Sequence, residues 1–196
     1  MLDQLRSYLN KSISLTDDQF QIISANLKIK QFVKGETILR AGEIGTNSYF
    51  VNSGLLRCFS IDQKGKEHII QFAPENWWVS DRNSILFNEP SDFFYDAAED
   101  TQAVVIPKDF FDRAAQLDPC VLNMNNVMLH KSIRFMQKRI NMLLSATAEE
   151  RYLDFIHLYP NLMLRVPQWM IASYLGITPE SLSRVRKDLA HKHFKA

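Results

Sequence analysis

Residues 166–187 read VPQWMIASYLGITPESLSRVRK, and this stretch decides the arrangement of the C-terminal part of the chain. Gly176 divides the stretch, because a residue without a Cβ permits a tight turn between two short helices. Thr178 is expected to cap the second helix and Pro179 to take its first position. Apolar residues on both sides of the turn are spaced to bury one small core: Ile171, Ala172, Leu175, Ile177, Leu182 and Val185. The stretch therefore predicts a pair of packed helices.

Polar side chains occupy the outer face of the second predicted helix. They are Thr178, Glu180, Ser181, Ser183, Arg184 and Lys187. A helix with polar residues at its start and basic residues behind them suits the major groove of DNA, where it meets base edges first and phosphates next. The alternative is a helical hairpin with a solvated polar face. Because Ala172, Gly176 and the Thr178-Pro179 pair fall at helix-turn-helix offsets, the pattern favours DNA binding.

Short apolar or alternating segments fill the chain from about residue 27 to Pro107. They are 27–33, 37–40, 48–52, 55–61, 68–72, 93–97 and 103–106. Turn residues separate them, and this spacing predicts an antiparallel β-roll of the jelly-roll type rather than a parallel sheet. The clearest hairpin turn is 62–66, where Gly65 can adopt a positive φ. Two short helices are expected before the roll, at 2–9 and after the caps at 14–18.

A long helix is expected after the roll and a short helix at 108–117. Asp118 is its expected N-cap, Pro119 its first residue, and it runs to about Ser145 without Gly or Pro. One stripe along it recurs at intervals of four and three, the pattern of two packed helices: Leu129, Ile133, Met136, Ile140 and Leu143. This predicts a homodimer seam, although the stripe could instead cover the β domain. Thr147 and Glu150 then form a capping-box pattern at the start of the next helix.

The fold class is therefore α+β, in three parts. Residues 1–117 are expected to form a β-roll sensor domain, residues 118–145 a dimerisation helix, and residues 146–196 a helix-turn-helix domain. The charge follows this division. Residues 1–118 hold 12 Lys/Arg and 17 Asp/Glu, a net charge of −5, whereas residues 119–196 hold 11 and 5, a net charge of +6. A basic C-terminal part suits an anionic partner such as double-stranded DNA.

Composition excludes several classes of protein. A hydrophobic share of 46% and a charged share of 23% rule out a disordered or fibrous chain. No apolar run approaches the length of about 18 residues needed to span a membrane, and the first ten residues have no apolar core of a signal peptide. Cys58 and Cys120 are expected to be buried thiols of a cytoplasmic protein. No P-loop, GxGxxG, HExxH or GxSxG motif occurs, so no catalytic residues and no enzyme activity are expected.

The order of β-roll, long helix and Ile171-Ala172-x-x-Leu175-Gly176-Ile177-Thr178-x-Glu180-x-x-Ser183-Arg184 resembles the Crp/Fnr regulators, and the resemblance covers nearly the whole chain. Trp77-Trp78 and residues 148–152 resemble the Bacteroidota-type members in particular. The resemblance implies a homodimeric transcription factor that responds to a ligand and works with RNA polymerase. It also implies that Glu180, Ser183 and Arg184 read bases, which fits a carboxylate on cytosine N4 and an Arg forked onto guanine.

The ligand-binding positions depart from the family pattern. Cyclic-nucleotide binders use a Gly-Glu pair and then an Arg-Ser pair, and these fall here on Ser80-Asp81 and Ser91-Asp92. Asp81 can still accept from a ribose hydroxyl, but the missing Arg removes the phosphate clamp and Asp92 repels a phosphate. Cyclic AMP is therefore not the expected ligand. Trp77 and Trp78 either stack on a ligand or pack under the long helix.

No cofactor is expected, and the effector is not identified by the sequence. Two cysteines cannot supply the four thiolates of an iron–sulfur cluster. Haem ligation by His68, His130 or His157 has no support, because isolated histidines are more often structural. After Lys187 nine residues remain, too few for the β-hairpin wing that usually follows the helix pair in this family.

Overall fold

The computed structural model describes residues 2–193 of the 196-residue chain. The chain divides into two compact units. The first comprises the residues up to Ile61 together with Ile70–Lys131, and the second comprises Asp62–Ile69 together with the residues from Ser132 onwards. The boundaries therefore fall inside a β-hairpin and inside the long helix. The three-part division at residues 117 and 145 stays a prediction.

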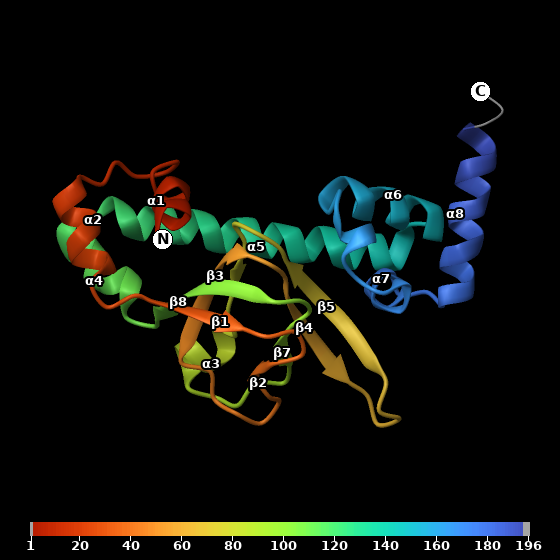
Figure 1. The fold of residues 1–196 in the computed structure, drawn as a ribbon, viewed down its shortest axis with the longest axis horizontal. Coiled ribbons are helices and arrows are strands. Elements are labelled where there is room, and N and C mark those ends of the chain that lie inside the picture. Colours follow the sequence, from red (N-terminus) through yellow and green to blue (C-terminus); the bar gives the residue numbers. More distant parts are fainter. Residues whose placement is uncertain (1, 194–196) are drawn as a thin grey trace. The chain divides into compact units, whose positions relative to one another are not determined.

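Two four-stranded sheets form most of the first unit (Figure 1). The strands are β1 (Lys28–Phe32), β2 (Thr37–Leu39), β3 (Asn47–Ser53), β4 (Leu56–Ile61), β5 (Glu67–Ala73), β6 (Trp78–Val79), β7 (Phe94–Ala97) and β8 (Thr101–Pro107). One sheet has the order β1-β8-β3-β6 and the other β2-β7-β4-β5. The pairs that β8 and β7 make with their neighbours are antiparallel. This confirms the predicted antiparallel roll with its seven strands, and it adds the two-residue β6.

Apolar residues of helices and strands form the larger core of this unit. The helices of this core are α1 (Asp3–Leu9), α2 (Asp17–Ser24) and α4 (Phe110–Leu117), together with the first turns of α5 (Cys120–Ser145). A further short helix, α3 (Arg82–Phe87), follows β6. In Figure 1, α1, α2 and α4 gather beside the start of α5. Their shared core includes Leu5, Ile23, Phe50, Ile106, Phe110 and Met124. We expected the second helix to continue through Leu27, but it ends at Ser24, and α3 was not predicted.

The start of α5 corrects two expectations. The helix begins at Cys120 rather than at Pro119, although Asp118 does act as a cap, since its Oδ1 accepts a hydrogen bond from Cys120 N at 2.9 Å. Cys120 is exposed, because the apolar face of this first turn is supplied by Val121 and Met124 instead. Cys58 is buried as expected, and burial raises the pKa of its thiol to about 12.

The second unit is helical beyond α5. Its further elements are α6 (Ala148–Leu158), the 3₁₀ turn η1 (Leu162–Leu164), α7 (Gln168–Leu175) and α8 (Pro179–His193). The predicted capping box is present, because Thr147 Oγ1 accepts from Glu150 N and Glu150 Oε2 accepts from Thr147 N. The rings of Phe155, Tyr159 and Tyr174 pack together in the core, with centroids 5.3 to 5.7 Å apart. None of the helices within residues 2–193 is long and apolar enough to cross a membrane.

Candidate nucleic-acid interface and sensor cavity

The turn between α7 and α8 has the geometry that its sequence predicts. Gly176 adopts φ +65°, in the left-handed region that favours glycine. Ile177 N donates to Ala172 O at 3.0 Å and Gly176 N donates to Ser173 O at 3.1 Å, which closes the end of α7. Four of the six residues expected in the small core are buried, namely Ile171, Ala172, Leu175 and Leu182, and the other two are half-buried. The helix pair is therefore held by a compact apolar contact.

The start of α8 is capped by Thr178. Its Oγ1 accepts a hydrogen bond from Ser181 N at 3.3 Å, which satisfies one of the backbone donors left open at the start of a helix. Hydrogen bonding by the Thr178 hydroxyl also lowers the pKa of Glu180 below its ordinary value. Glu180 therefore stays an ionised acceptor at neutral pH, as reading a cytosine amino group requires.

The expected recognition residues lie together on α8 and on the residue that caps it. Thr178, Glu180, Ser183, Arg184 and Lys187 are exposed and Ser181 is half-buried. Positions three and four residues apart lie on one face of a helix, so Glu180, Ser183 or Arg184, and Lys187 form a continuous polar stripe. Leu182, on the opposite face, is fully buried. The side chains on the stripe can accept, donate or carry positive charge toward a ligand outside the unit.

Lys192, further along α8, lies outside this stripe and is paired within the unit. Its Nζ lies 2.7 and 2.9 Å from the two carboxylate oxygens of Glu149, at the start of α6. Any contact of Lys192 with a DNA phosphate therefore competes with an ion pair inside the unit. Arg184 and Lys187 remain the exposed cations on the stripe itself.

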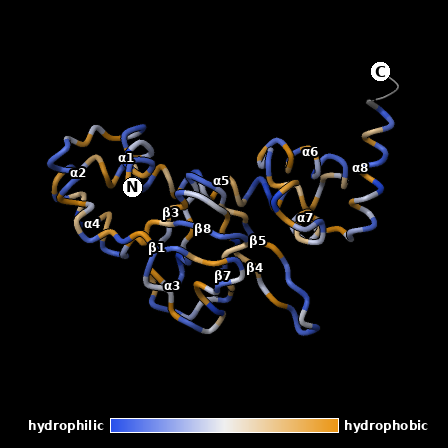
Figure 2. Tube along the Cα trace, viewed as in Figure 1, coloured by the Kyte–Doolittle hydropathy of each residue, from blue (hydrophilic) through white to orange (hydrophobic). Residues whose placement is uncertain are grey.

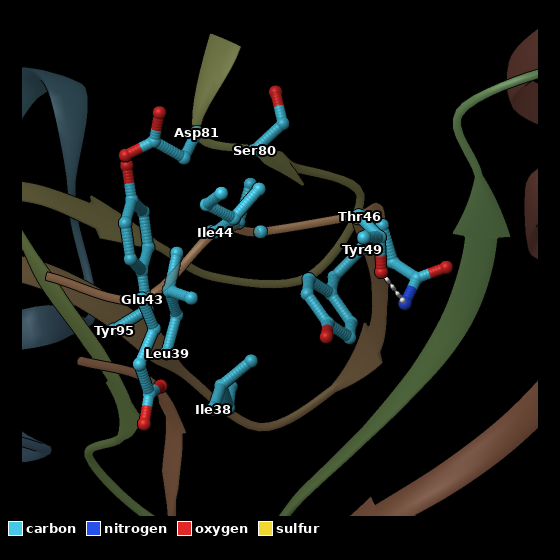
Figure 3. A pocket seen from close by; sticks show the side chains of 12 residues that line it. Ile38, Leu39, Glu43, Ile44, Thr46, Tyr49, Ser80, Asp81 and Tyr95 are labelled. Atoms are coloured by element: carbon cyan, nitrogen blue, oxygen red, sulfur yellow. Dashed lines mark hydrogen bonds between the residues drawn. The ribbon is translucent and has the colours of Figure 1, made fainter. Parts of the chain in front are cut away.

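A cavity of about 300 Å³ opens in the first unit (Figure 3). It lies between β2, the loop that follows it, the starts of β3 and α3, and strands β6 and β7. Its lining is largely apolar and hydroxylated: Ile38, Leu39, Glu43, Ile44, Gly45, Thr46, Asn47, Tyr49, Val79, Ser80, Asp81 and Tyr95. The charged side chains among these residues are the carboxylates of Glu43 and Asp81.

Asp81 is buried on the wall of this cavity and caps α3. Its Oδ1 accepts from Ser84 N at 2.9 Å, and its Oδ2 accepts from the hydroxyl of Ser91. Figure 3 shows the Tyr95 hydroxyl directed toward the same carboxylate. Burial, and then the nearby Cys58 and Asp81, raise the pKa of Tyr95, so its hydroxyl stays protonated. Both oxygens of Asp81 already have donors from the chain itself, although we expected them to be open to a ribose hydroxyl.

The remaining residues expected at the pocket lie in different places. Ser91 is buried behind Asp81, and Asp92 is exposed. Trp78 packs against the rings of Tyr8 and Phe50, at centroid distances of 5.9 and 5.4 Å, beside α1. Trp77 packs against the second apolar core, which includes Val51 and Val79. Of the six expected residues, Ser80 and Asp81 are the two that belong to the described lining of this cavity.

Sequence reasoning missed the ion pair inside the roll. Arg57 on β4 and Asp96 on β7 are paired in the strand register and both are buried. Arg57 Nε and Nη2 lie 2.7 and 2.8 Å from the two oxygens of Asp96, and the guanidinium stacks over the ring of Phe59 at 4.2 Å. A buried arginine needs such a partner. Arg57 is a charged residue within the apolar run 55–61, and this feature of the sequence could have indicated a buried ion pair.

The roll is similar to a known domain family. Residues 29–118 match the family model described as the cyclic nucleotide-binding domain. Among solved structures, FixK2 from Bradyrhizobium japonicum has a TM-score of 0.73 at 21% identity, with 85% of this chain and 86% of that chain covered. The catabolite activator protein of Thermus thermophilus has a TM-score of 0.56 at 19% identity, with 92% and 86% covered. These likenesses show the fold.

Curated relatives match in sequence as well. The anaerobic regulatory protein of Haemophilus influenzae is 26% identical over 167 residues, which cover 80% of this chain and 64% of the relative. The transcriptional activator protein FnrA of Stutzerimonas stutzeri is 30% identical over 163 residues, which cover 78% of this chain and 66% of the relative. The chain thus spans slightly less than two thirds of the length of these relatives. The resemblance to Bacteroidota-type members stays a prediction.

Proposed function

Because this chain belongs to the Crp/Fnr superfamily, we propose that it is a sequence-specific DNA-binding regulator of transcription that acts in the cytoplasm as a homodimer. The observation that carries the proposal is the exposed stripe on α8, set on a buried helix pair by the Gly176 turn and the Thr178 cap. A similar protein is named as a transcriptional activator. RNA polymerase is the further partner that such a function requires.

In this proposal α8 lies in the major groove. Glu180 accepts a hydrogen bond from a cytosine amino group. Arg184 donates two hydrogen bonds from its guanidinium, one to guanine O6 and one to guanine N7. Ser181 and Ser183 form hydrogen bonds to base edges or phosphates. Thr178 contacts the DNA backbone at the start of α8. Lys187 lies one turn further along and neutralises a phosphate. This order follows from the spacing of exposed residues along α8.

The dimer is proposed from the apolar stripe of α5. Ile133, Ile140 and Leu143 are 53, 56 and 40% exposed, while Leu129 and Met136 are half-buried. Residues of this type at heptad spacing gain free energy when a second helix covers them. A two-fold dimer sets its recognition helices about one turn of DNA apart, which matches a palindromic operator.

The sensor cavity supports an effector other than a cyclic nucleotide. A cyclic phosphate needs a cation or several converging donors, whereas the described lining offers the carboxylates of Glu43 and Asp81. Apolar side chains and the hydroxyl of Tyr49 suit a small ligand with an apolar body and an acceptor group. We propose no metal or prosthetic group for this cavity.

The second candidate is a small-molecule-binding or structural dimer whose DNA-binding half no longer functions. Loss of function in that half predicts loss of the residues that serve only DNA. Glu180, Arg184 and Lys187 are all retained and exposed, which favours the first candidate.

Selection of bound DNA from a random pool tests the two candidates. The purified protein is expected to enrich a palindrome whose half-sites are about ten base pairs apart. Fluorescence anisotropy on the enriched duplex and on a scrambled duplex then measures specificity, with a ratio of at least about 10³ expected at physiological salt. Failure to enrich any motif, with equal affinity for both duplexes, contradicts the proposal.

A further inference from the structure

The apolar stripe of α5 continues toward the start of the helix. Its intervals of four and three extend back by one heptad, to Asn126 and then to Leu122. Both residues are exposed, although Val121 and Met124 beside them are buried in the core of the first unit. Figure 2 shows how apolar and hydrophilic residues interleave along this helix. The predicted dimer seam therefore has seven positions instead of five.

These positions divide into the two kinds that form the seam of a heptad repeat. An interval of three leads from position a to position d, and an interval of four leads from d to the next a. Position d is occupied by Leu122, Leu129, Met136 and Leu143, and position a by Asn126, Ile133 and Ile140. β-branched residues at a combined with leucine at d favour two parallel helices. The seam therefore fits a second copy of this chain that runs in the same direction.

The positions that flank the seam allow two copies to approach each other. In a parallel pair, position g of one helix lies beside position e in the following heptad of the other. The residues that meet in this way are Asn125 with His130, Ser132 with Gln137, and Arg139 with Leu144. None of these pairs joins two charges of the same sign, so repulsion at the flanks does not oppose a parallel dimer.

Asn126 is the polar member of the seam. Its side-chain amide both donates and accepts hydrogen bonds, so two copies that lie opposite each other can bond across the two-fold axis. If one helix slips by a heptad, or if the two full stripes run antiparallel, each Asn126 lies against an apolar side chain instead. A buried amide without a hydrogen-bond partner is unfavourable. The parallel alignment that pairs the two amides is therefore favoured over these alternatives.

We infer that Asn126 fixes the register and the parallel orientation of the α5 dimer, an inference that rests on the dimer of the proposed function. Asn126 contributes specificity at the expense of affinity, because an apolar residue at this position would bury more apolar surface. The register matters for DNA binding. A slip of one heptad displaces one helix by about 10 Å along the other, which offsets the two recognition helices relative to a palindromic operator.

The first test compares the self-association of Asn126→Ile with that of Asn141→Ile. Asn141 is exposed on the same helix at position b, outside the seam, so it serves as the matched control. Asn126→Ile is expected to lower the dimer dissociation constant roughly 10- to 100-fold, because it buries two more isoleucine side chains in the seam. Asn141→Ile should leave the constant unchanged. Sedimentation equilibrium measures both. Asn126 is exposed in the single chain, so its replacement is not expected to unfold the protein.

The second test measures the register directly. A spin label on Asn141→Cys reports the distance between the two copies, once Cys120→Ser has removed the exposed native thiol and left the buried Cys58. With Asn126 in place, one narrow distance distribution is expected. With Asn126→Ile, or with the smaller Asn126→Val, a broader distribution or a second distance is expected, because slipped and antiparallel pairs are no longer disfavoured.

Two outcomes overturn the inference. If Asn126→Ile does not associate more tightly than the unmutated protein, position 126 does not lie in the seam. If the distance distribution stays narrow and unchanged in both substituted proteins, another residue fixes the register. A monomeric unmutated protein is a separate outcome, because it contradicts the dimer of the proposed function and the inference together.

Discussion

Ser91 donates its hydroxyl to Asp81 Oδ2 on the wall of the sensor cavity, while Ser84 N bonds to the other oxygen of the same carboxylate. Both partners of this pair are buried. The two positions at which the family places ligand-holding groups are thus bonded to each other here. The pair joins the start of α3 to the segment before β7. Its groups therefore stabilise the wall of the cavity and do not form a binding site for an anion.

Calorimetry is therefore expected to show no binding of cyclic AMP or cyclic GMP at micromolar concentrations. The cavity presents Glu43 and Asp81 to a ligand, and a carboxylate next to a phosphate is unfavourable. The control is Ser91→Arg with Asp92→Ser, which restores the Arg-Ser pair of the family and should raise nucleotide affinity if it folds. Micromolar binding by the unmutated protein contradicts the prediction and points to another cation such as Arg82, which Arg82→Ala then tests.

Gly176→Ala is expected to destabilise the second unit by more than about 1 kcal/mol, the cost of a left-handed alanine. At φ +65° an added Cβ meets Leu143 Cδ2 at 3.1 Å and Arg151 Nη1 at 3.4 Å. Gly65→Ala is the matched control, because Gly65 also has a positive φ, of +78°, but nothing lies within 4 Å of its added Cβ. Urea unfolding measures both. If both variants lose the same free energy of unfolding, crowding of the added Cβ against Leu143 does not contribute to the destabilisation.

Ile140→Glu is expected to convert the proposed dimer to monomers. Ile140 is 56% exposed in the single chain and lies on the predicted seam, so the substitution buries two carboxylates against each other. A loss of about 3 kcal/mol corresponds to roughly a hundredfold weaker association. Asn141→Glu adds the same charge at the adjacent exposed position and serves as the control. Sedimentation velocity at micromolar concentration measures both, and a monomeric unmutated protein contradicts the seam.

The hairpin turn should resist acid. The hydrogen bond with His68, followed by the backbone N–H groups of Lys66 and Lys64, lowers the pKa of Asp62 from 3.8 to about 2. Because the folded-state pKa is depressed, the stabilisation is fully present above about pH 3.8 and is lost as the pH falls toward 2. An NMR titration of the Asp62 carboxyl measures the pKa directly. Asp62→Asn, which cannot ionise, should remove this pH dependence, and a measured pKa near 3.8 contradicts the prediction.

Local patterns were enough to predict most of the fold. Alternating apolar residues located seven strands, and cap residues such as Thr147 and Thr178 located the starts of α6 and α8. The recognition stripe was predicted for the same reason, because residues that share a helix face are fixed by spacing alone. The two-residue β6 and the six-residue α3 were too short to produce a periodic signal.

The cavity and the hydrogen bond between Ser173 and Ile69 depend on contacts between distant segments. Tyr49 and Tyr95 reach the same cavity from different strands, and Ser173 reaches Ile69 across 104 residues. No local pattern indicates such a pairing. The position of Trp78 also depends on tertiary contacts, since its packing against Phe50 follows from how β6 pairs with β3.

Arg184 and Lys187 should separate base reading from phosphate contact. Arg184→Ala is expected to cost about 1–3 kcal/mol on the selected operator and to flatten the preference at one base pair, because a bidentate contact to guanine is lost. Lys187→Ala should instead weaken all duplexes alike and reduce the slope of log K against log salt by about one, because one fewer counterion is released. Anisotropy on selected and scrambled duplexes across a salt series measures both.

Glu180→Ala provides the third member of this series. Its carboxylate is ionised and exposed at the start of α8, so its removal should relax the preference at one base pair and leave non-specific affinity nearly unchanged. Lys192→Ala is the matched control for Lys187→Ala, because Lys192 is already paired with Glu149 and should change the salt slope less. If Arg184→Ala weakens selected and scrambled DNA by the same factor, Arg184 contacts the backbone and the orientation assigned to α8 is wrong.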